Sequence, residues 1–475
     1  MQREKEPIKE KVYGFLSDAE VENVLQRGQK ASLDFCRQAL DNGRKARGLT
    51  LEEVAALAYC DDPEIYLGLM EVAHQLKLQI YGDRMVFFAP LYISSYCSNN
   101  CLYCAFRYAN RDLERKTLSS EEIQHEVRAI LRQGHKRLLV VAGEDPKTTG
   151  IDYLEQAIEA VYSVDEAGST IRRANVNCAP LSVDHFKRLH ATGIGTYQCF
   201  QETYHRPTYK VVHPSGPKSN YDWRVSAADR AMEAGIDDYG AGVLFGLYDW
   251  HFEVVAMLGH ARYLETKFGV GPHTLSVPRL EPALGAPLSE ESEYMVRDGD
   301  FKKIIALLRV AVPYTGMILS TRESAELRDE LFALGISQTS AGSKTTPGGY
   351  AEGPIEQEPS AAGQFVLQDQ RPLKDMVKSF VTHDYIPSFC TACYRSGRTG
   401  DRFMQLAKSG KIHDICGPNA IVSLKEYLLD YADEDTRTLG EQLIIKEMAA
   451  MPEGLRSATA KMLERLAQGE RDIYL

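Results

Sequence analysis

The stretch that decides the fold is Tyr96-Cys97-Ser98-Asn99-Asn100-Cys101-Leu102-Tyr103-Cys104. Its cysteines follow a Cys-x3-Cys-x2-Cys spacing, which places three thiolates on one tight loop. Three thiolates can hold three irons of a cubane 4Fe-4S cluster and leave the fourth iron open to another molecule. Zinc is the alternative, but a structural zinc site needs four ligands, so a His or Cys from elsewhere in the chain would have to complete it.

Composition and charge exclude several classes of protein. The chain has 475 residues, of which 44% are hydrophobic and 25% charged, as in ordinary soluble proteins. Its net charge of −11 argues against a nucleic-acid partner, because phosphate backbones are bound by basic surfaces. No apolar run is long enough for a membrane span, and the charged start Met1-Gln-Arg-Glu-Lys-Glu is unlike a secretion signal. We therefore expect a cytoplasmic protein without a membrane partner.

Ten cysteines in a long chain without a secretion signal indicate metal ligands rather than disulfides. Six of them fall into two groups, the Cys97 loop and a second group in the tail, Cys390, Cys393 and Cys416. The second group has the spacing Cys-x2-Cys-x22-Cys, so two thiolates from one turn can meet a third from beyond a short predicted helix. It also leaves one position of a cubane free, although His413 would complete a Cys3His zinc site instead.

From about residue 86, short apolar runs alternate with helical ones. The predicted strands are 86–93, 137–142, 171–177, 195–201, 237–244, 274–277, 316–319 and 336–339. The predicted helices between them are 120–133, 153–165, 183–191, 225–234, 252–268, 301–311 and 324–334. This alternation predicts an α/β fold, a closed (β/α)8 TIM-type barrel. In such barrels the chemistry lies at the carboxyl ends of the strands, and the Cys97 loop follows the first strand.

Helical segments are predicted on both sides of this barrel. Capped amphipathic runs predict a helical N-terminal extension at residues 1–80, and the barrel itself is expected at 81–345. Residues 342–363 are rich in Gly, Pro and Ser, which predicts a linker. A helical C-terminal domain at 346–475 then carries the second cysteine group, and Pro452 is expected to split its last helical run.

The Cys97 loop resembles the signature of the radical S-adenosylmethionine (SAM) enzymes, including an aromatic residue, Tyr103, just before the third cysteine. The resemblance implies that Cys97, Cys101 and Cys104 hold a 4Fe-4S cluster whose open iron chelates SAM. In that family an electron from the cluster cleaves SAM to methionine and a 5′-deoxyadenosyl radical. An electron donor such as ferredoxin or flavodoxin is therefore an expected partner.

The tail carries a second resemblance, in Cys393-Tyr-Arg-Ser-Gly-Arg-Thr-Gly-Asp-Arg-Phe-Met, Ile415-Cys-Gly-Pro-Asn-Ala and Glu426-Tyr-Leu-Leu-Asp-Tyr. These stretches are similar to the C-terminal domain of the HydG family, the radical SAM tyrosine lyases of [FeFe]-hydrogenase maturation. The resemblance implies cleavage of tyrosine at Cα–Cβ to p-cresol and dehydroglycine, which then yields CO and cyanide. It also implies a second 4Fe-4S cluster at Cys390, Cys393 and Cys416, with an additional iron that captures these products.

Two other functions stay open at this point. The related ThiH tyrosine lyases of thiamine biosynthesis share the barrel but lack the tail cysteines, and a radical SAM tyrosine lyase or sulfur-inserting enzyme of another pathway is one alternative. A non-catalytic iron–sulfur scaffold is the other, although it leaves the polar strand ends unexplained. In the HydG family the product passes to other hydrogenase maturation proteins, which are therefore expected partners.

The candidate SAM residues lie near the ends of the predicted strands. Gly143 and Glu144 follow the second strand, where the family usually has a Gly-Gly-Glu that meets the SAM amino group. Ala142 replaces the first Gly here, and an acid pair that faces water at a helix N-terminus is the alternative. Asn177 and Glu202 end the third and fourth strands, and their oxygens suit ribose hydroxyls and an ammonium group.

Arg224 is the candidate cation for the SAM carboxylate, because a guanidinium makes a two-point fork with a carboxylate. A surface pair with Asp222 is the alternative. Arg322 and Ser340 end the last two strands and are predicted to fix the carboxylate of a tyrosine substrate. A helix-capping or salt-bridge role is the alternative for both.

His273 is the candidate ligand for the additional iron, since a barrel histidine has that role in the family and imidazole suits ferrous iron. It is preferred over His251 and His260, which belong to a helical run. Its position at the start of a strand is unusual for a barrel enzyme, where strand ends carry the chemistry.

Overall fold

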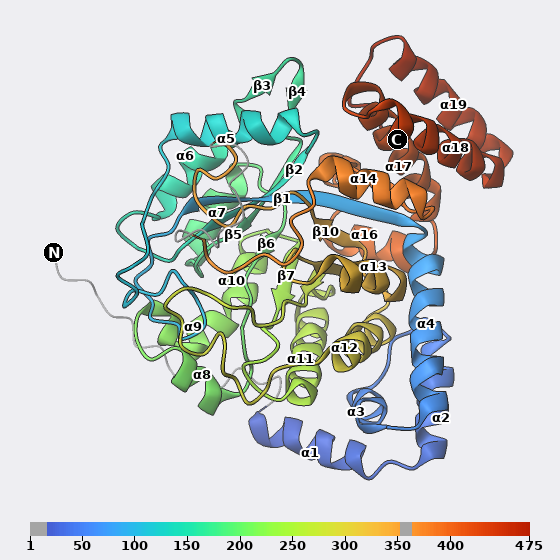
Figure 1. The fold of residues 1–475 in the computed structure, drawn as a ribbon. Coiled ribbons are helices and arrows are strands. Elements are labelled where there is room, and N and C mark those ends of the chain that lie inside the picture. Colours follow the sequence, from blue (N-terminus) through green and yellow to red (C-terminus); the bar gives the residue numbers. More distant parts are fainter. Residues whose placement is uncertain (1–16, 352–362) are drawn as a thin grey trace.

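A computed structural model describes residues 17–351 and 363–475, and a closed barrel of eight parallel strands forms its centre (Figure 1). The strands are β1 (Arg84–Ser94), β2 (Arg137–Ala142), β5 (Arg173–Asn177), β6 (Tyr197–Gln198), β7 (Tyr239–Gly242), β8 (Thr274–Ser276), β9 (Gly316–Leu319) and β10 (Gln338–Ser340). β10 pairs back with β1 through Val86↔Gln338 and Phe88↔Ser340, which closes the barrel. The predicted TIM-type fold is therefore confirmed.

Helices surround the barrel and cover the outer faces of its strands. They are α5 (Ser120–Arg132), α6 (Ile151–Tyr162), α7 (Val183–Ala191), α10 (Ala227–Glu233), α11 (Trp250–Phe268), α12 (Asp298–Ala311) and α13 (Ala325–Leu334). Each corresponds to a predicted helix, with ends displaced by a few residues at most. A hairpin of β3 (Asp165–Glu166) and β4 (Ser169–Thr170), and the short helices α8 (Arg206–Val212) and α9 (Tyr221–Val225), were not predicted.

Four helices precede the barrel: α1 (Asp18–Gln29), α2 (Leu33–Gly43), α3 (Leu51–Tyr59) and α4 (Pro63–Tyr81). Ser17 and Thr50 cap α1 and α3 with complete capping boxes, as their sequences predict. α1 packs on α11, and α4 packs on α12, so this layer extends the outer ring of barrel helices at one side (Figure 1). No residue of these four helices lines either of the two cavities described below, apart from Tyr81 at the end of α4.

The tail begins with α14 (Leu373–Thr382) and a short strand, β11 (Ile386–Ser388). β11 pairs in parallel with the first residues of β1, through Arg84↔Ile386 and Val86↔Ser388, which was not predicted. The helices α15 (Ala392–Arg395), α16 (Gly400–Lys408), α17 (His413–Asp430), α18 (Glu434–Ala450) and α19 (Glu453–Ala467) follow, and the predicted break at Pro452 is confirmed. The tail is thus attached to the amino end of the barrel, opposite the Cys97 loop. The domain boundaries stay a prediction.

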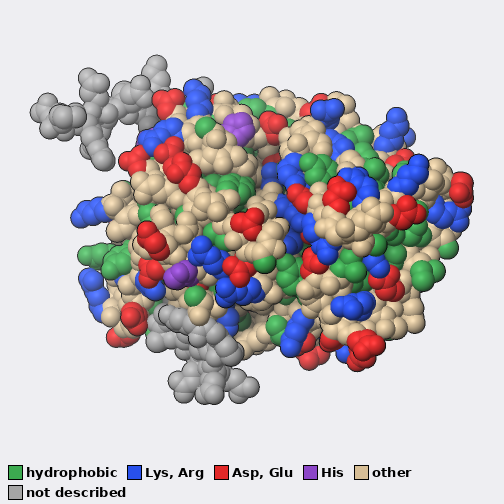
Figure 2. Space-filling model, turned by 90° about the horizontal axis from the view of Figure 1, so that it is seen from above, with side chains coloured by type: hydrophobic (Ala, Val, Ile, Leu, Met, Phe, Trp, Pro, Cys, Tyr) green, Lys and Arg blue, Asp and Glu red, His purple; other side chains and the backbone are tan. Residues whose placement is uncertain are grey.

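Acidic and basic side chains are interspersed over the described part of the face that Figure 2 shows. Within residues 17–351 and 363–475, every helix is too short or too polar to cross a membrane.

A buried ion pair ties the start of the tail to the barrel. Arg328 on α13 donates to the carboxylate of Asp369, and the two side chains are 0% and 1% exposed. Arg328 also donates to Thr339 Oγ1 at 2.7 Å and to the backbone oxygen of Ser340 at 2.6 Å, both on β10. Removing one partner of such a pair leaves a buried charge without compensation.

We expect Asp369→Ala to lower the free energy of unfolding by about 3 kcal/mol, because Arg328 would stay buried without its carboxylate. Asp184→Ala is the matched control, since Asp184 forms an exposed pair with Lys187 that contributes about 1 kcal/mol or less. Urea unfolding followed by circular dichroism measures both changes. Equal shifts for the two variants would contradict a structural role for the buried pair.

Candidate active site

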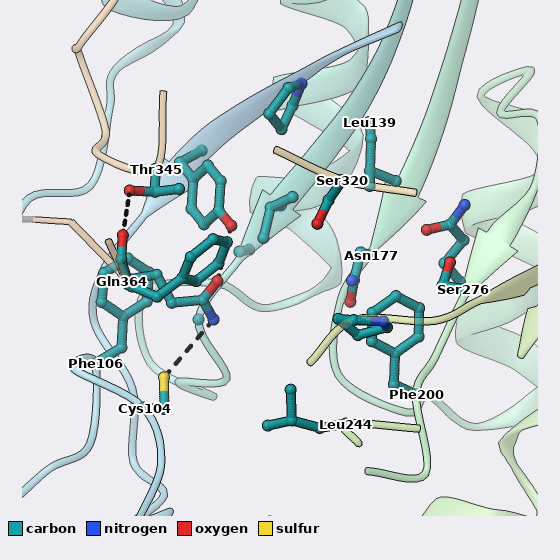
Figure 3. A pocket seen from close by; sticks show the side chains of 18 of the residues that line it. Cys104, Phe106, Leu139, Asn177, Phe200, Leu244, Ser276, Ser320, Thr345 and Gln364 are labelled. Carbon is teal, nitrogen blue, oxygen red and sulfur yellow. Dashed lines mark hydrogen bonds between the residues drawn. The ribbon is translucent and has the colours of Figure 1, made fainter. Parts of the chain in front are cut away.

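One cavity opens at the carboxyl ends of the strands, and we call it the upper cavity (Figure 3). It is lined by all of the residues predicted to bind the first cluster, SAM and tyrosine: Cys97, Cys101, Tyr103, Cys104, Gly143, Glu144, Asn177, Glu202, Arg224, Arg322 and Ser340. These side chains come from segments that are far apart in the sequence. The structure therefore brings the predicted set together, while the role of each residue stays a prediction.

The Cys97 loop is fixed by backbone contacts with its neighbours. The amide of Ser98 donates to the backbone oxygen of Glu144 at 2.8 Å, and the amide of Asn100 donates to that of Ser215 at 3.1 Å. Gly143 approaches the loop so closely that a Cβ atom at this position would lie 2.3 Å from the backbone oxygen of Tyr96. A side chain is therefore excluded at Gly143 unless the loop moves.

The three thiols of this loop suit a negatively charged iron–sulfur cluster. Burial raises the pKa of Cys101 to about 12 and that of Cys104 to about 11, so bare thiolates would be costly here. The ammonium of Lys218 lowers the pKa of all three thiols. A cationic neighbour in a buried site stabilises anionic ligands, so these residues fit the group that the loop pattern predicts.

A single metal ion fits the described residues less well. Among residues 17–351 and 363–475, no three His, Cys, Asp or Glu side chains are placed to hold one ion. A cubane needs no such convergence, because each thiolate binds a different iron.

Glu202 is held in the upper cavity by two cations and an unusual backbone conformation. Its φ is +70°, in the left-handed region that few residues other than glycine adopt. Its carboxylate lies 2.5 Å from Lys218 Nζ and 3.5 Å from an Arg224 nitrogen. Burial raises the pKa of Glu202, but Lys218 and Arg224 outweigh this effect and hold the pKa below its usual range. Glu202 is therefore ionised at neutral pH, and its carboxylate is suited to accept hydrogen bonds from an ammonium or a hydroxyl group.

Arg224 is buried, with 7% of its surface exposed, so the alternative of a surface pair with Asp222 is wrong. Asp222 instead pairs with Arg206 at 3.0 Å. Arg224 Nε donates to the backbone oxygen of Phe200 at 2.7 Å, which fixes the guanidinium at the edge of the cavity.

Glu144 contacts the Cys97 loop rather than standing free in water. Its Oε2 accepts from Asn99 Nδ2 at 2.7 Å, and its neighbour Asp145 accepts from Ser98 Oγ at 2.8 Å. The acid pair therefore stabilises the loop, and the alternative of two carboxylates facing solvent is wrong. Gly143 and Glu144 still line the cavity.

Arg322 lines the upper cavity and has no carboxylate within 4.0 Å among the described residues. Burial lowers the pKa of Arg322, although Glu281 and Glu202 lie near enough to act in the opposite direction. Its guanidinium stacks on the ring of Phe365, 3.3 Å from the ring centroid. Ser340 lies on the neighbouring strand end and is 2% exposed. A partly buried guanidinium without a paired carboxylate is suited to bind the carboxylate of a ligand.

A second cavity, the lower cavity, lies at the amino ends of the strands. Its lining includes the three tail cysteines and His273, together with Arg84, Arg137, Tyr394 and Phe403. His273 Nε2 is 3.0 Å from Tyr394 Oη, and its ring packs on Phe403. Burial lowers the pKa of His273, so its imidazole is neutral at pH 7, the form that binds metals. His273 comes at the start of a strand, away from the usual strand-end chemistry of a barrel, and the tail brings its three cysteines to that end.

The other candidate histidines do not line this cavity. His413 Nε2 is 2.5 Å from the backbone oxygen of Gln79, so it does not complete a Cys3His site with the tail cysteines. His260 Nδ1 is 2.8 Å from Tyr204 Oη, and His251 stacks on Trp250. Neither of these two residues lines either cavity.

The tail thiols also face positive charge. The neighbouring Cys393 thiol lowers the pKa of Cys416, and the nearby guanidinium of Arg84 acts in the same direction. The amide of Ala392 lies 3.4 Å from Cys390 Sγ. These donors and cations fit a second thiolate-bound cluster.

Several residues that line the two cavities carry no recognisable sequence signal. Lys218, Arg84 and Arg137 are single basic residues in ordinary contexts, and no spacing marks them. The Gly216-Pro217 pair is the only local sequence signal near Lys218. In the structure Gly216 has a φ of +95°, and a Cβ atom at this position would lie 2.5 Å from Asn99 Oδ1 of the cysteine loop.

We expect Gly143→Ala to weaken SAM binding at least tenfold, because its Cβ would push on the Tyr96 carbonyl and displace the loop, at a cost of about 1.4 kcal/mol or more. Gly299→Ala is the control, since no atom lies within 4 Å of a Cβ at that position. Equilibrium dialysis of radiolabelled SAM against the reconstituted proteins measures the change. Unchanged binding in Gly143→Ala would show that the close approach is unimportant.

Comparisons with known proteins agree with this geometry. The Radical SAM superfamily model matches residues 91–258, and that of the Biotin and Thiamin Synthesis associated domain matches 276–386. A 2-iminoacetate synthase from Salmonella typhimurium is 33% identical over 337 residues, 70% of this chain and 84% of the relative. A crystal structure of HydG, a maturase of the [FeFe]-hydrogenase, is 49% identical with a TM-score of 0.93, over 97% of this chain and 100% of that one. HydG from Carboxydothermus hydrogenoformans is 42% identical with a TM-score of 0.80, over 94% and 100%. The chain therefore belongs to the radical SAM superfamily and, within it, to the HydG family.

Proposed function

We propose that this chain cleaves tyrosine at Cα–Cβ to p-cresol and dehydroglycine, and that it converts dehydroglycine to CO and cyanide for [FeFe]-hydrogenase assembly. The observation that carries the proposal is one barrel with a three-thiol cavity at each end. The likeness to HydG structures over nearly the whole chain supports it. Atoms and electrons balance: tyrosine and SAM, with two electrons from the reductant and one proton, give p-cresol, dehydroglycine, 5′-deoxyadenosine and methionine. Dehydroglycine then divides into CO, hydrogen cyanide and water.

The residues of the upper cavity would hold the first cluster and SAM. Cys97, Cys101 and Cys104 would bind a 4Fe-4S cluster, which with SAM supplies a 5′-deoxyadenosyl radical. Glu202, and Asn177 on the neighbouring strand, would accept hydrogen bonds from the ribose hydroxyls or the ammonium group of SAM. Arg224 would pair with the SAM carboxylate from its fixed position beside Phe200. Together these contacts orient SAM and keep water from the reacting atoms.

Tyrosine would bind in the upper cavity beside Arg322. The stacked guanidinium of Arg322 would pair with the substrate carboxylate, and the hydroxyl of Ser340 would donate to it. This arrangement would fix the amino acid end of the substrate and leave its ring in the apolar part of the lining.

The lower cavity would hold the second cluster at Cys390, Cys393 and Cys416, with His273 as ligand of an additional iron on which CO and cyanide are captured. The two cavities lie end to end inside the barrel. On β1, Val86 lines the lower cavity and Phe88 lines the upper one, two residues apart or about 7 Å along the strand. Small products would therefore travel a short distance within the protein.

A second candidate is a tyrosine lyase that stops at dehydroglycine, which is also named 2-iminoacetate. The 33% identity with a 2-iminoacetate synthase favours it. It leaves the lower cavity, with three thiols and a neutral imidazole, without a role.

The proposal is tested by incubating anaerobically reconstituted protein with SAM, dithionite and tyrosine. We expect deoxyadenosine, p-cresol and CO, the last trapped by haem. p-Cresol without CO would favour the second candidate. No deoxyadenosine above the level without tyrosine would favour a non-catalytic scaffold.

We expect the double variant Cys390→Ala, Cys393→Ala to keep p-cresol formation and to lose CO, because only the lower cavity is changed. The iron content should fall from about eight or nine per chain to about four. A loss of p-cresol to the same degree as CO would mean that the tail thiols serve the radical step or the fold.

We expect Arg322→Gln to raise the KM for tyrosine about 100-fold, since a buried charged hydrogen bond contributes about 2 to 3 kcal/mol. SAM binding should stay unchanged. Arg224→Gln is the reciprocal variant, with weakened SAM binding and a tyrosine KM near that of the native chain. If Arg322→Gln weakens the binding of SAM and of tyrosine equally, Arg322 does not bind the tyrosine substrate specifically.

A further inference from the structure

Residues 363–369, which we call the strap, cross the open end of the barrel. The amide of Gln364 donates to the backbone oxygen of Thr345 at 3.2 Å, and the amide of Ala105 donates to that of Gln364 at 3.3 Å. The amide of Val366 donates to the backbone oxygen of Pro282 at 2.9 Å. The strap is therefore fixed to the loops that follow β1, β8 and β10, and its Gln364, Phe365 and Leu367 line the upper cavity.

The side chain of Gln364 reaches the cysteine loop directly. Its Nε2 lies 3.6 Å from Cys104 Sγ (Figure 3). Its Oε1 accepts a hydrogen bond from Tyr92 Oη at 2.7 Å. Backbone groups of Asn99 and Glu144 also contact a thiol of this loop, but that thiol is Cys97. A backbone group of Phe106 also reaches Cys104. Gln364 is thus a side-chain N–H donor to a thiol of this loop.

Tyr92 determines which end of the Gln364 amide faces the sulfur. Burial raises the pKa of Tyr92, so its phenol keeps its proton. The phenol donates to Gln364 Oε1, and a thiolate at Cys104 can only accept, so both partners favour the same orientation of the amide. The amino end of Gln364 then points to Cys104. The relay Tyr92, Gln364, Cys104 joins strand β1, the strap and the cysteine loop.

We propose that Gln364 is a positioning residue that raises the reduction potential of the cluster in the upper cavity through its N–H···S contact with Cys104. The inference rests on the proposed binding of that cluster by Cys97, Cys101 and Cys104. An N–H donor stabilises negative charge on a thiolate, and the reduced cluster carries one more negative charge than the oxidised one. The contact therefore favours the reduced state.

The test compares Gln364→Leu with Gln368→Leu, in the Cys390→Ala, Cys393→Ala background so that one cluster contributes. Gln368 lies on the same strap but donates to Glu281 at 2.9 Å, away from the thiols. An EPR-monitored redox titration measures the midpoint potential of each protein. For Gln364→Leu we expect the ratio of reduced to oxidised cluster at a fixed potential to fall about tenfold, a shift of about 59 mV to more negative potential. Gln368→Leu should match the background.

An unchanged potential in Gln364→Leu would overturn the inference, and so would an equal shift in Gln368→Leu, which would assign the effect to the strap as a whole. Tyr92→Phe gives an independent test, because it keeps the amide and removes the group that orients it. We expect a smaller shift in the same direction, and a potential equal to that of the background would again overturn the inference. A failure of the proposed cluster site would give a different result. In that case Cys101→Ala would leave the EPR signal of the background protein unchanged, or the background protein would have no cluster signal.

Discussion

Pairing between β1 and β10 closes the barrel, and both cavities depend on this closure. β1 has 11 residues, whereas the other barrel strands have between two and six. Side chains alternate along a strand, so the inward residues of β1 serve both ends of the barrel. Arg84 and Val86 line the lower cavity, and Phe88, Pro90 and Tyr92 line the upper one. A single strand thus contributes to two sites that face opposite ends of the molecule.

Charge balance constrains what can be buried inside this barrel. Thiolates and carboxylates lose their hydration in the interior and need nearby cations or N–H donors. Lys218 and Arg224 supply positive charge at the upper end, beside Glu202, and Arg84 supplies it at the lower end, beside Cys416. Each cavity therefore has its own compensating positive charge, and the two groups of thiols do not share a counter-charge.

The sequence predicts the barrel well because its signals are local. The spacing of Cys97, Cys101 and Cys104 lies within eight residues, and β2 and β9 have the predicted bounds. Contacts between distant parts of the chain could not be predicted. Gln364 is 260 residues from Cys104, and no sequence pattern indicates that the two side chains meet. β11 was missed because three residues that include a proline carry no strand signal of their own. Its pairing with β1 is a property of the folded barrel.

The same pairing explains why a histidine at the start of a strand belongs to a site. In TIM-type barrels the amino ends of the strands usually serve stability, since no chain segment brings chemistry there. Here β11 adds to β1 only as far as Val86↔Ser388, because β2 takes over the same edge of β1 from Ala89. The tail must therefore leave the sheet after Ser388, and Cys390 follows two residues later. The thiols reach the amino end of the barrel by this route, and there they meet His273, which comes just before β8.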